Sequence, residues 1–403
     1  MVKGFIFFND DKIPFVIEQY QMELFTDDSI LKNFCKEHNP KSNYILHGQC
    51  FEFNAESQNA TFLVNHSIGN ICYLQCYIVH ALVRDINYDT LGIQSPFLDD
   101  IFKYKYEHLE KVRAGINLGV TTQDIYTIPF SMNTHQYTLS FRIGQNSKLG
   151  LLEDFDRKGE CILPLHNHTI QECYNISVVL YRFAMFMTSH AEVPFKQITL
   201  YNKGRKMGWL YCPFLSKNPT SAYDIFFREL NVLKYVPKIL NNIALDSGNK
   251  ITQSIPLGHL GTLESMYSPQ RFIEQITAFE YLFDKLDHEK AQSSKFSLKK
   301  ELMYMFNIFP QLLASTRSSS DLVSEEIKEL RRTIVHGYSY YYDFKNDHRK
   351  KYLIHLLDDL IKYMSLKWIG FSNEEIHNYN FCKTLYLIFD YPYKYYTFKL
   401  FEV

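Results

Sequence analysis

The chain has few glycines and prolines and no long apolar run. Its 403 residues include only 16 Gly and 13 Pro, a composition that excludes a collagen-like or low-complexity chain. No uninterrupted apolar stretch approaches the roughly 20 residues of a membrane span, and the apolar run at the amino terminus is too short for a signal peptide. We therefore expect a cytoplasmic protein that makes no contact with a membrane.

An excess of positive charge is also missing. The 43 Lys and Arg residues are balanced by 44 Asp and Glu residues, which gives a formal net charge of −1. A protein that coats nucleic acid without sequence preference is usually far more basic. Any contact with RNA must therefore use positive charge that is concentrated locally.

Cysteines are present but show no metal-binding pattern. The eight cysteines are scattered along the chain, and we expect them to be reduced in the cytoplasm. Cys72 and Cys76 have no second pair at zinc-ligand spacing, so we interpret them as core residues. A phosphate-binding Gly-x-x-x-x-Gly-Lys-Ser/Thr string is also absent from the sequence, so we do not expect the chain to use ATP.

Apolar side chains are abundant, at 46% of the sequence, and the length exceeds the usual size of one core, so we expect two domains. Short segments rich in β-branched and aromatic residues predict a β-rich domain over residues 1–215. Its strands are expected at 43–53, 61–64, 70–83 and 136–142. A helix over 175–189 and a hairpin around 202–204 are expected to complete it.

Beyond residue 219 the apolar positions recur at helical spacing. Helices are predicted for 222–240, 269–286, 298–313, 324–335 and 348–368, and the serine-rich segment 314–321 is predicted to be a loop. Residues 216–370 are thus expected to form an all-α bundle, followed by an appendage over 371–403 with a short strand at 395–401. The predicted fold class is α+β, with a β-rich N-terminal domain followed by a helical bundle.

The segment over 329–337, Glu-Leu-Arg-Arg-Thr-Ile-Val-His-Gly, ends one of these predicted helices. Arg332 and His336 are four residues apart and share a helix face, with Arg331 on its flank. His336 lies at the negative end of the helix dipole, which favours its protonated form. An imidazole that titrates near neutral pH beside guanidinium groups suits the cleavage of a phosphodiester.

These residues resemble the R-x-x-x-x-H signature of HEPN ribonuclease domains, with Arg331 and His336 as the fixed positions and polar Arg332 between them. The string Ala-Phe-Glu-Tyr-Leu-Phe around Glu280 is similar to the acidic early helix of that family. The last helix ends in Trp-Ile-Gly-Phe at 368–371, as many HEPN domains do. The N-terminal half, from Lys-Gly-Phe at 3–5 to a helix–strand unit over 175–200, is similar to the ApeA group of bacterial anti-phage HEPN proteins.

The resemblance implies a metal-independent endoribonuclease without a cofactor. In that mechanism the ribose 2′-OH attacks its own phosphate and leaves 2′,3′-cyclic phosphate and 5′-OH ends. His336 is expected to act as general base or acid, and Arg331 to hold the phosphate. Arg332 would support the phosphate or orient His336, and Glu280 would support an arginine. One histidine is insufficient for two proton transfers, so a homodimer is expected.

Positive charge is concentrated around the motif, with seven Lys or Arg against three Asp or Glu from Lys328 to Lys351. Lys328, Tyr338 and Tyr340 are the candidate contacts to the RNA substrate, because tyrosines stack on the bases of single-stranded or looped RNA. Packing within the protein is the competing interpretation of these tyrosines.

The resemblance also implies a biological setting, in which the N-terminal domain senses a phage-encoded trigger or restrains the nuclease. Two other interpretations stay open: a non-catalytic module for dimerisation or RNA binding, and a toxin restrained by a separate antitoxin. The arginines are also compatible with a solvated face paired with Glu325, Glu326 and Glu329.

Two other sequence patterns give weaker evidence of a functional site. The His-Asn-His string at 166–168 spells a nuclease motif without the rest of that site, so we interpret it as part of a strand and loop. His355 and Asp359, four residues apart on the last helix, are expected to form a surface pair.

Overall fold

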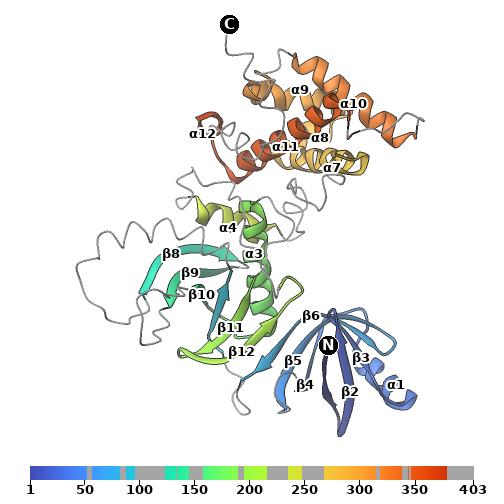
Figure 1. Ribbon diagram of the computed structural model, residues 1–403, viewed down its shortest axis with the longest axis vertical. Helices are drawn as coiled ribbons and strands as arrows, with labels where there is room; N and C mark the ends of the chain where they lie inside the picture. Colours follow the sequence, from blue (N-terminus) through green and yellow to red (C-terminus); the bar gives the residue numbers. More distant parts are fainter. Residues whose placement is uncertain are drawn as a thin grey trace, which may run out of the picture. The chain divides into compact units, whose positions relative to one another are not determined.

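A computed structural model describes residues 1–51, 57–81, 88–95, 123–132, 134–144, 158–188, 195–215, 235–246, 267–314, 318–337, 344 and 346–378. The chain divides into two compact units (Figure 1). The N-terminal unit comprises Met1–Ala184 and Glu192–Asp224, and the helical unit comprises Met185–Ala191 and Ile225–Val403. The N-terminal unit is rich in β-strands, so the chain as a whole combines the two classes as α+β.

Six strands at the start of the chain close into a barrel. They are β1 (Val2–Phe8), β2 (Asp11–Glu18), β3 (Gln21–Leu24), β4 (Tyr44–Cys50), β5 (Gln58–Ile68) and β6 (Ile71–His80). They pair in the order β3-β2-β1-β4-β5-β6, and β3 also pairs with β6. Because successive side chains of a strand point to opposite faces, β1 buries Val2, Ile6 and Phe8. Helix α1 (Asp28–Glu37) adds Phe34 to this core, with its ring 5.2 Å from that of Phe8.

The same sheet continues from β6 through a second group of strands. In spatial order these are β12 (Arg205–Tyr211), β11 (Gln197–Asn202), β7 (Thr90–Gln94), β10 (Lys158–Pro164), β9 (His135–Gly144) and β8 (Gln123–Met132). Helix α3 (Ile170–Thr188) follows β10 in the chain, and its side chains Ile176, Leu180 and Phe183 are completely buried. Lys203 and Gly204 form the turn between β11 and β12, both with positive φ.

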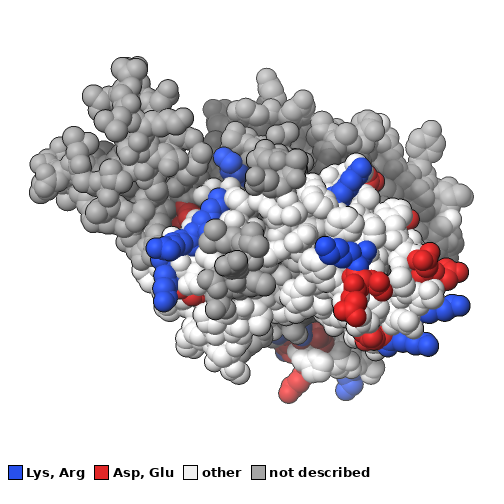
Figure 2. All heavy atoms as spheres, turned by 90° about the horizontal axis from the view of Figure 1, so that it is seen from below, with Lys and Arg blue, Asp and Glu red and all other residues white. Residues whose placement is uncertain are grey.

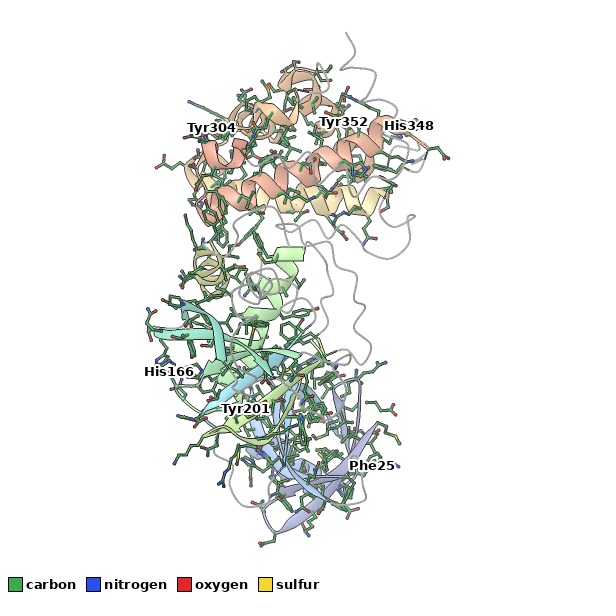
Figure 3. The ribbon with its side chains drawn as sticks, turned by 60° about the vertical axis from the view of Figure 1, so that its left-hand side comes forward. Phe25, His166, Tyr201, Tyr304, His348 and Tyr352 are labelled. Atoms are coloured by element: carbon green, nitrogen blue, oxygen red, sulfur yellow. The ribbon has the colours of Figure 1, made fainter. Side chains whose placement is uncertain are left out.

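A buried carboxylate fixes the loop before α3. Oε1 of Glu172 accepts hydrogen bonds from the Tyr137 hydroxyl and from the backbone N–H of His166, both at 2.8 Å. Its Oε2 accepts from the N–H groups of Asn167 and His168 at 2.8 and 2.9 Å. The His-Asn-His string is therefore a structural loop after a strand, as predicted; His166 is labelled in Figure 3.

The sequence predicted part of this unit correctly. Strands β4, β5, β6 and β9, the hairpin of β11 with β12, and most of α3 lie where they were expected. Helix α3 begins at Ile170, five residues before the predicted start. Cys72 and Cys76 are fully buried free thiols, which confirms them as core residues.

The helical unit contains α4 (Val236–Leu245), α7 (Pro269–Leu286), α8 (His288–Ala291), α9 (Leu298–Ile308), the short 3-10 helix η2 (Pro310–Leu312), α10 (Ser320–Val335), α11 (His348–Ile369) and α12 (Asn373–Asn378). The prediction of 269–286 is confirmed at both ends. The helix predicted for 348–368 is confirmed with one additional residue, because Gly370 ends it in the left-handed conformation at φ 99°.

Three other helix boundaries were wrong. Helix α9 ends at Ile308 and not at residue 313 as predicted, because Pro310 cannot continue the backbone hydrogen bonds of a helix. Helix α10 begins four residues early, because the Ser319 hydroxyl caps it by accepting from the N–H of Leu322. Helix α4 begins at Val236 and extends past residue 240. The remainder of that prediction, 222–234, and the predicted strand at 395–401 lie outside the described residues.

Helices α7 and α11 are joined by polar contacts as well as apolar ones. Arg271 of α7 pairs with Asp358 of α11 at 3.0 Å, with both side chains largely buried. His355 is bonded to the Tyr267 hydroxyl at 2.8 Å, and the carboxylate of Asp359 lies 3.8 Å from the Lys362 ammonium. The predicted surface pair of His355 with Asp359 is therefore wrong, because each side chain has another partner. None of the described helices has the length and apolar character needed to cross a membrane.

Replacing Glu172 with Gln tests the loop anchor. Burial alone would raise the pKa of Glu172, but its four hydrogen bonds outweigh burial and lower it. A folded-state pKa below the ordinary value contributes stability above that value, which is lost as the pH falls. We expect Glu172→Gln to lower the free energy of unfolding by about 2 kcal/mol near pH 7, and by progressively less as the pH falls below 4.5. Urea denaturation near pH 7 and well below pH 4.5 measures this, with the exposed Glu18→Gln as control; an equal loss at both would contradict it.

Candidate functional site

Helix α10 places His336 at its C-terminal cap. The backbone N–H of His336 donates to the Arg332 carbonyl at 3.0 Å, and that of Gly337 donates to the Ile334 carbonyl at 3.3 Å. Gly337 has a φ of 62°, a conformation that a residue without a Cβ adopts at low cost. The His336 side chain is exposed, at the end of the helix where the dipole is negative.

The two arginines of the motif reach different partners. Nη2 of Arg331 lies 3.4 Å from Oε1 of Glu280, so this pair joins α10 to α7. Nη2 of Arg332 lies 2.6 Å from Oε2 of Glu329, one turn earlier on the same helix. The Arg331 and Glu280 side chains are about half-exposed, and Arg332 is more exposed. The structure thus brings Arg331 and Glu280 together and leaves Arg332 in a local surface pair.

The other cations beside the motif are also compensated by carboxylates. Lys328 lies 2.6 Å from Glu325 and 3.2 Å from Glu329. Arg349 of α11 makes two hydrogen bonds to Oε2 of Glu326, at 2.6 and 2.8 Å. For Arg332 and Lys328 this geometry agrees with the interpretation as a solvated, ion-paired face. Among the described residues, the positive charge of Lys328, Arg331, Arg332 and Arg349 is therefore offset by neighbouring carboxylates.

The surface of the molecule shows a similar mixture where it can be seen. On the face drawn in Figure 2, some Lys and Arg side chains adjoin one another at the left edge and others lie beside Asp and Glu, within a largely uncharged surface. The described residues on this face do not form the extended positive field that nonspecific nucleic-acid binding uses.

Glu301 of α9 belongs to the site and was missed in the sequence. The residue is 9% exposed, and it lies on the buried stripe of α9 with Leu302, Met305 and Phe306. Burial and the nearby negative charge of Glu280 raise its pKa to about 7, while the positive charge of Arg331 acts in the opposite direction. The available signal was its spacing, because position 301 follows Leu298 by three residues and falls on the apolar face of the predicted helix.

The remaining predicted site residues cannot be placed. Tyr338 and Tyr340 lie outside the described residues, so base stacking stays a prediction. Within the part of the chain that is described, no group of three or more His, Cys, Asp or Glu side chains is arranged to hold a metal ion. Comparisons of the chain with protein-family models, with curated proteins and with solved structures found no match. Its function must therefore be inferred from its own residues.

The burial of Glu301 predicts an unusual dependence of stability on pH. Because its folded-state pKa lies above the ordinary 4.5, ionisation costs stability as the pH rises from about 4.5 to 7. Glu301→Gln removes that cost, so its stability relative to the unchanged protein should improve by about 3 kcal/mol between pH 4 and pH 8. Urea denaturation across this range measures the difference.

Glu325→Gln is the matched control for this experiment. Its carboxylate is exposed, and hydrogen bonds from Lys328 and Lys299 lower its pKa. The stability of that variant relative to the unchanged protein should therefore fall as the pH rises, opposite to Glu301→Gln. If both variants showed the same trend, ionisation of Glu301 would not lower the stability of the folded protein, and the prediction would be wrong.

Proposed function

We propose that the helical unit is a metal-independent endoribonuclease domain of the HEPN kind, with Arg331 and His336 at its reactive centre. One observation carries this proposal: the exposed His336 ends the same helix on which Arg331 is held by a carboxylate from a second helix. This places a proton-transfer group and an oriented guanidinium near the end of α10, together with the R-x-x-x-x-H spacing.

The chemistry divides between these two side chains. The 2′-oxygen of the ribose forms a bond to phosphorus as its proton passes to a base, and the bond from phosphorus to the 5′-oxygen breaks as that oxygen gains a proton. An imidazole serves either proton transfer near neutral pH. The guanidinium of Arg331 binds the phosphate oxygens and stabilises their developing charge. Its half-exposed pair with Glu280 is weak, so a phosphate can replace the carboxylate.

The other residues have supporting roles in this proposal. Glu280 orients Arg331 before RNA binds, and Arg332 and Lys328 exchange their carboxylate partners for RNA phosphates. Tyr338 and Tyr340 stack on bases of single-stranded or looped RNA. The proposed active form is a homodimer, in which a second His336 supplies the second proton transfer, and the reaction uses no metal ion or cofactor.

The biological role that we propose is that of a bacterial anti-phage effector in the cytoplasm. The N-terminal unit, with its separate β-barrel core, restrains the nuclease until a phage-encoded trigger binds. Restraint by a separate antitoxin is the alternative arrangement. A co-purifying small protein would favour the alternative, whereas an autonomous chain would favour the N-terminal unit.

His336→Ala tests the proposed reaction. Purified protein is incubated with total bacterial RNA in EDTA, and the fragment ends are analysed for 2′,3′-cyclic phosphate. We expect the variant to cleave at least about 100-fold more slowly, because a general acid–base group contributes that much to a proton transfer. Arg331→Ala should show a loss of similar size.

His288→Ala is the matched control. Its side chain is 71% exposed and belongs to a local pair with Asp284 on another part of the helical unit. We expect it to cleave as the unchanged protein does. Absence of cleavage by all proteins, even with phage lysate added, would contradict the ribonuclease proposal and favour a non-catalytic dimerisation or RNA-binding module.

A further inference from the structure

Glu301 is an ionisable side chain in a position that an apolar residue would normally occupy. It is nine-tenths buried on the inner stripe of α9. Among the described residues, no hydrogen-bond donor reaches its carboxyl group, although its backbone N–H donates to the Ser297 carbonyl. A buried carboxyl without a donor lowers stability. Departures of this kind from the local packing pattern are expected at functional sites.

The charged groups that face Glu301 are those of the proposed reactive centre. Glu280 approaches it from α7 with negative charge, and Arg331 approaches it from α10 with positive charge. The two cations that precede it on α9 have other partners. The Lys299 ammonium pairs with Asp321 at 2.8 Å and Glu325 at 3.0 Å, and the Lys300 ammonium donates to the Lys295 carbonyl at 2.8 Å. Arg331 thus forms its ion pair with Glu280 on α7 and also acts, through its charge, on the buried carboxyl of Glu301 on α9.

We propose that Glu301 is a positioning residue which, by gaining or losing a proton, sets how readily Arg331 leaves Glu280 for an RNA phosphate. This inference rests on the proposed function, since it concerns the same phosphate site. It adds a regulatory input, the local pH, that acts through a side chain without contact to the substrate.

The physical reason lies in the charge around the guanidinium. When Glu301 is protonated, only Glu280 holds Arg331, through a half-exposed pair that a phosphate can displace. When Glu301 is ionised, a second negative charge acts near the guanidinium and repels an incoming phosphate. With a pKa of about 7, the carboxyl group changes its charge in the physiological range.

Linkage gives the sign of the effect. An anion that binds Arg331 favours the protonated form of Glu301, so RNA binding takes up a proton near neutral pH. By the same linkage, the affinity for RNA falls as the pH rises through about 7. Removing the ionisation should therefore strengthen RNA binding at high pH and leave it nearly unchanged at low pH.

The first experiment measures the binding of a labelled single-stranded RNA between pH 6 and pH 8.5. Both proteins carry His336→Ala to prevent cleavage, and one also carries Glu301→Gln. We expect equal affinities at pH 6 and about tenfold tighter binding by the Glu301→Gln protein at pH 8, which corresponds to one added charge at short range. The pH dependence of His336 is absent from both proteins. A constant affinity ratio across the range would overturn the proposal.

The same substitution in the active protein separates positioning from chemistry. With His336 present, Glu301→Gln should lower KM for RNA at pH 8 by more than it changes kcat, because the substitution makes Arg331 easier for the phosphate to reach. Glu301→Asp, which keeps an ionisable carboxyl, should retain a KM that rises with pH. A fall in kcat with no change in KM would contradict a positioning role.

A second experiment does not depend on ribonuclease activity and keeps Glu301 in place. Full-length protein labelled with ¹³C at the glutamate carboxyl carbon is titrated by NMR, and Glu301→Gln assigns the Glu301 signal. Inorganic phosphate should move the titration of this signal to higher pH, and Arg331→Ala should do the same and abolish the response to phosphate. If no RNA is cleaved but these responses are found, the ribonuclease proposal fails and the coupling stands. If Arg331→Ala left the titration of the Glu301 signal unchanged, the proposed coupling itself would be wrong.

Discussion

The guanidinium of Arg331 lies where α7, α9 and α10 meet, and it offsets the negative charge of the acidic residues there. Without it, nothing among the described residues would oppose the effect of burial and of the Glu280 charge, which both raise the pKa of Glu301. Arg331 therefore contributes to the arrangement of the helices as well as to the proposed chemistry. A loss of activity in an Arg331 variant cannot show which of these two roles was lost. A pH dependence can, because only the electrostatic role of Arg331 varies with the protonation of Glu301.

Compensation of charge extends along α10 beyond Arg331. Lys328, Arg332 and Arg349 all have carboxylate partners. Exposed pairs of this kind contribute at most about 1 kcal/mol each, so phosphates can compete for the cations. RNA binding at this surface would thus exchange carboxylates for phosphates without bringing new positive charge to the surface.

The sequence predicted the elements whose signals are local. Helix α7 was predicted at both ends, because Pro269 lies in its first turn and its apolar stripe is regular. The first strands were not predicted, because apolar Phe5 and Phe7 on the outer face of β1 obscure the alternation of buried positions. That Glu280 would support one of the arginines came from the family resemblance, and the structure shows that this arginine is Arg331. The role of Glu301 depends on contacts among three helices, and a sequence pattern alone does not contain them.

The geometry of α10 also bears on the need for a second chain. An α-helix turns by about 100° per residue, so two side chains five residues apart leave it about 140° apart. Arg331 is directed to Glu280 on α7, whereas His336 shares its face with Arg332, which Glu329 holds on the surface. One chain thus presents the oriented guanidinium and the imidazole on different sides of the helix. In the proposed homodimer, the imidazole of one copy would lie near the guanidinium of the other. The proposed dimer would also supply the second proton-transfer group of the proposed cleavage reaction.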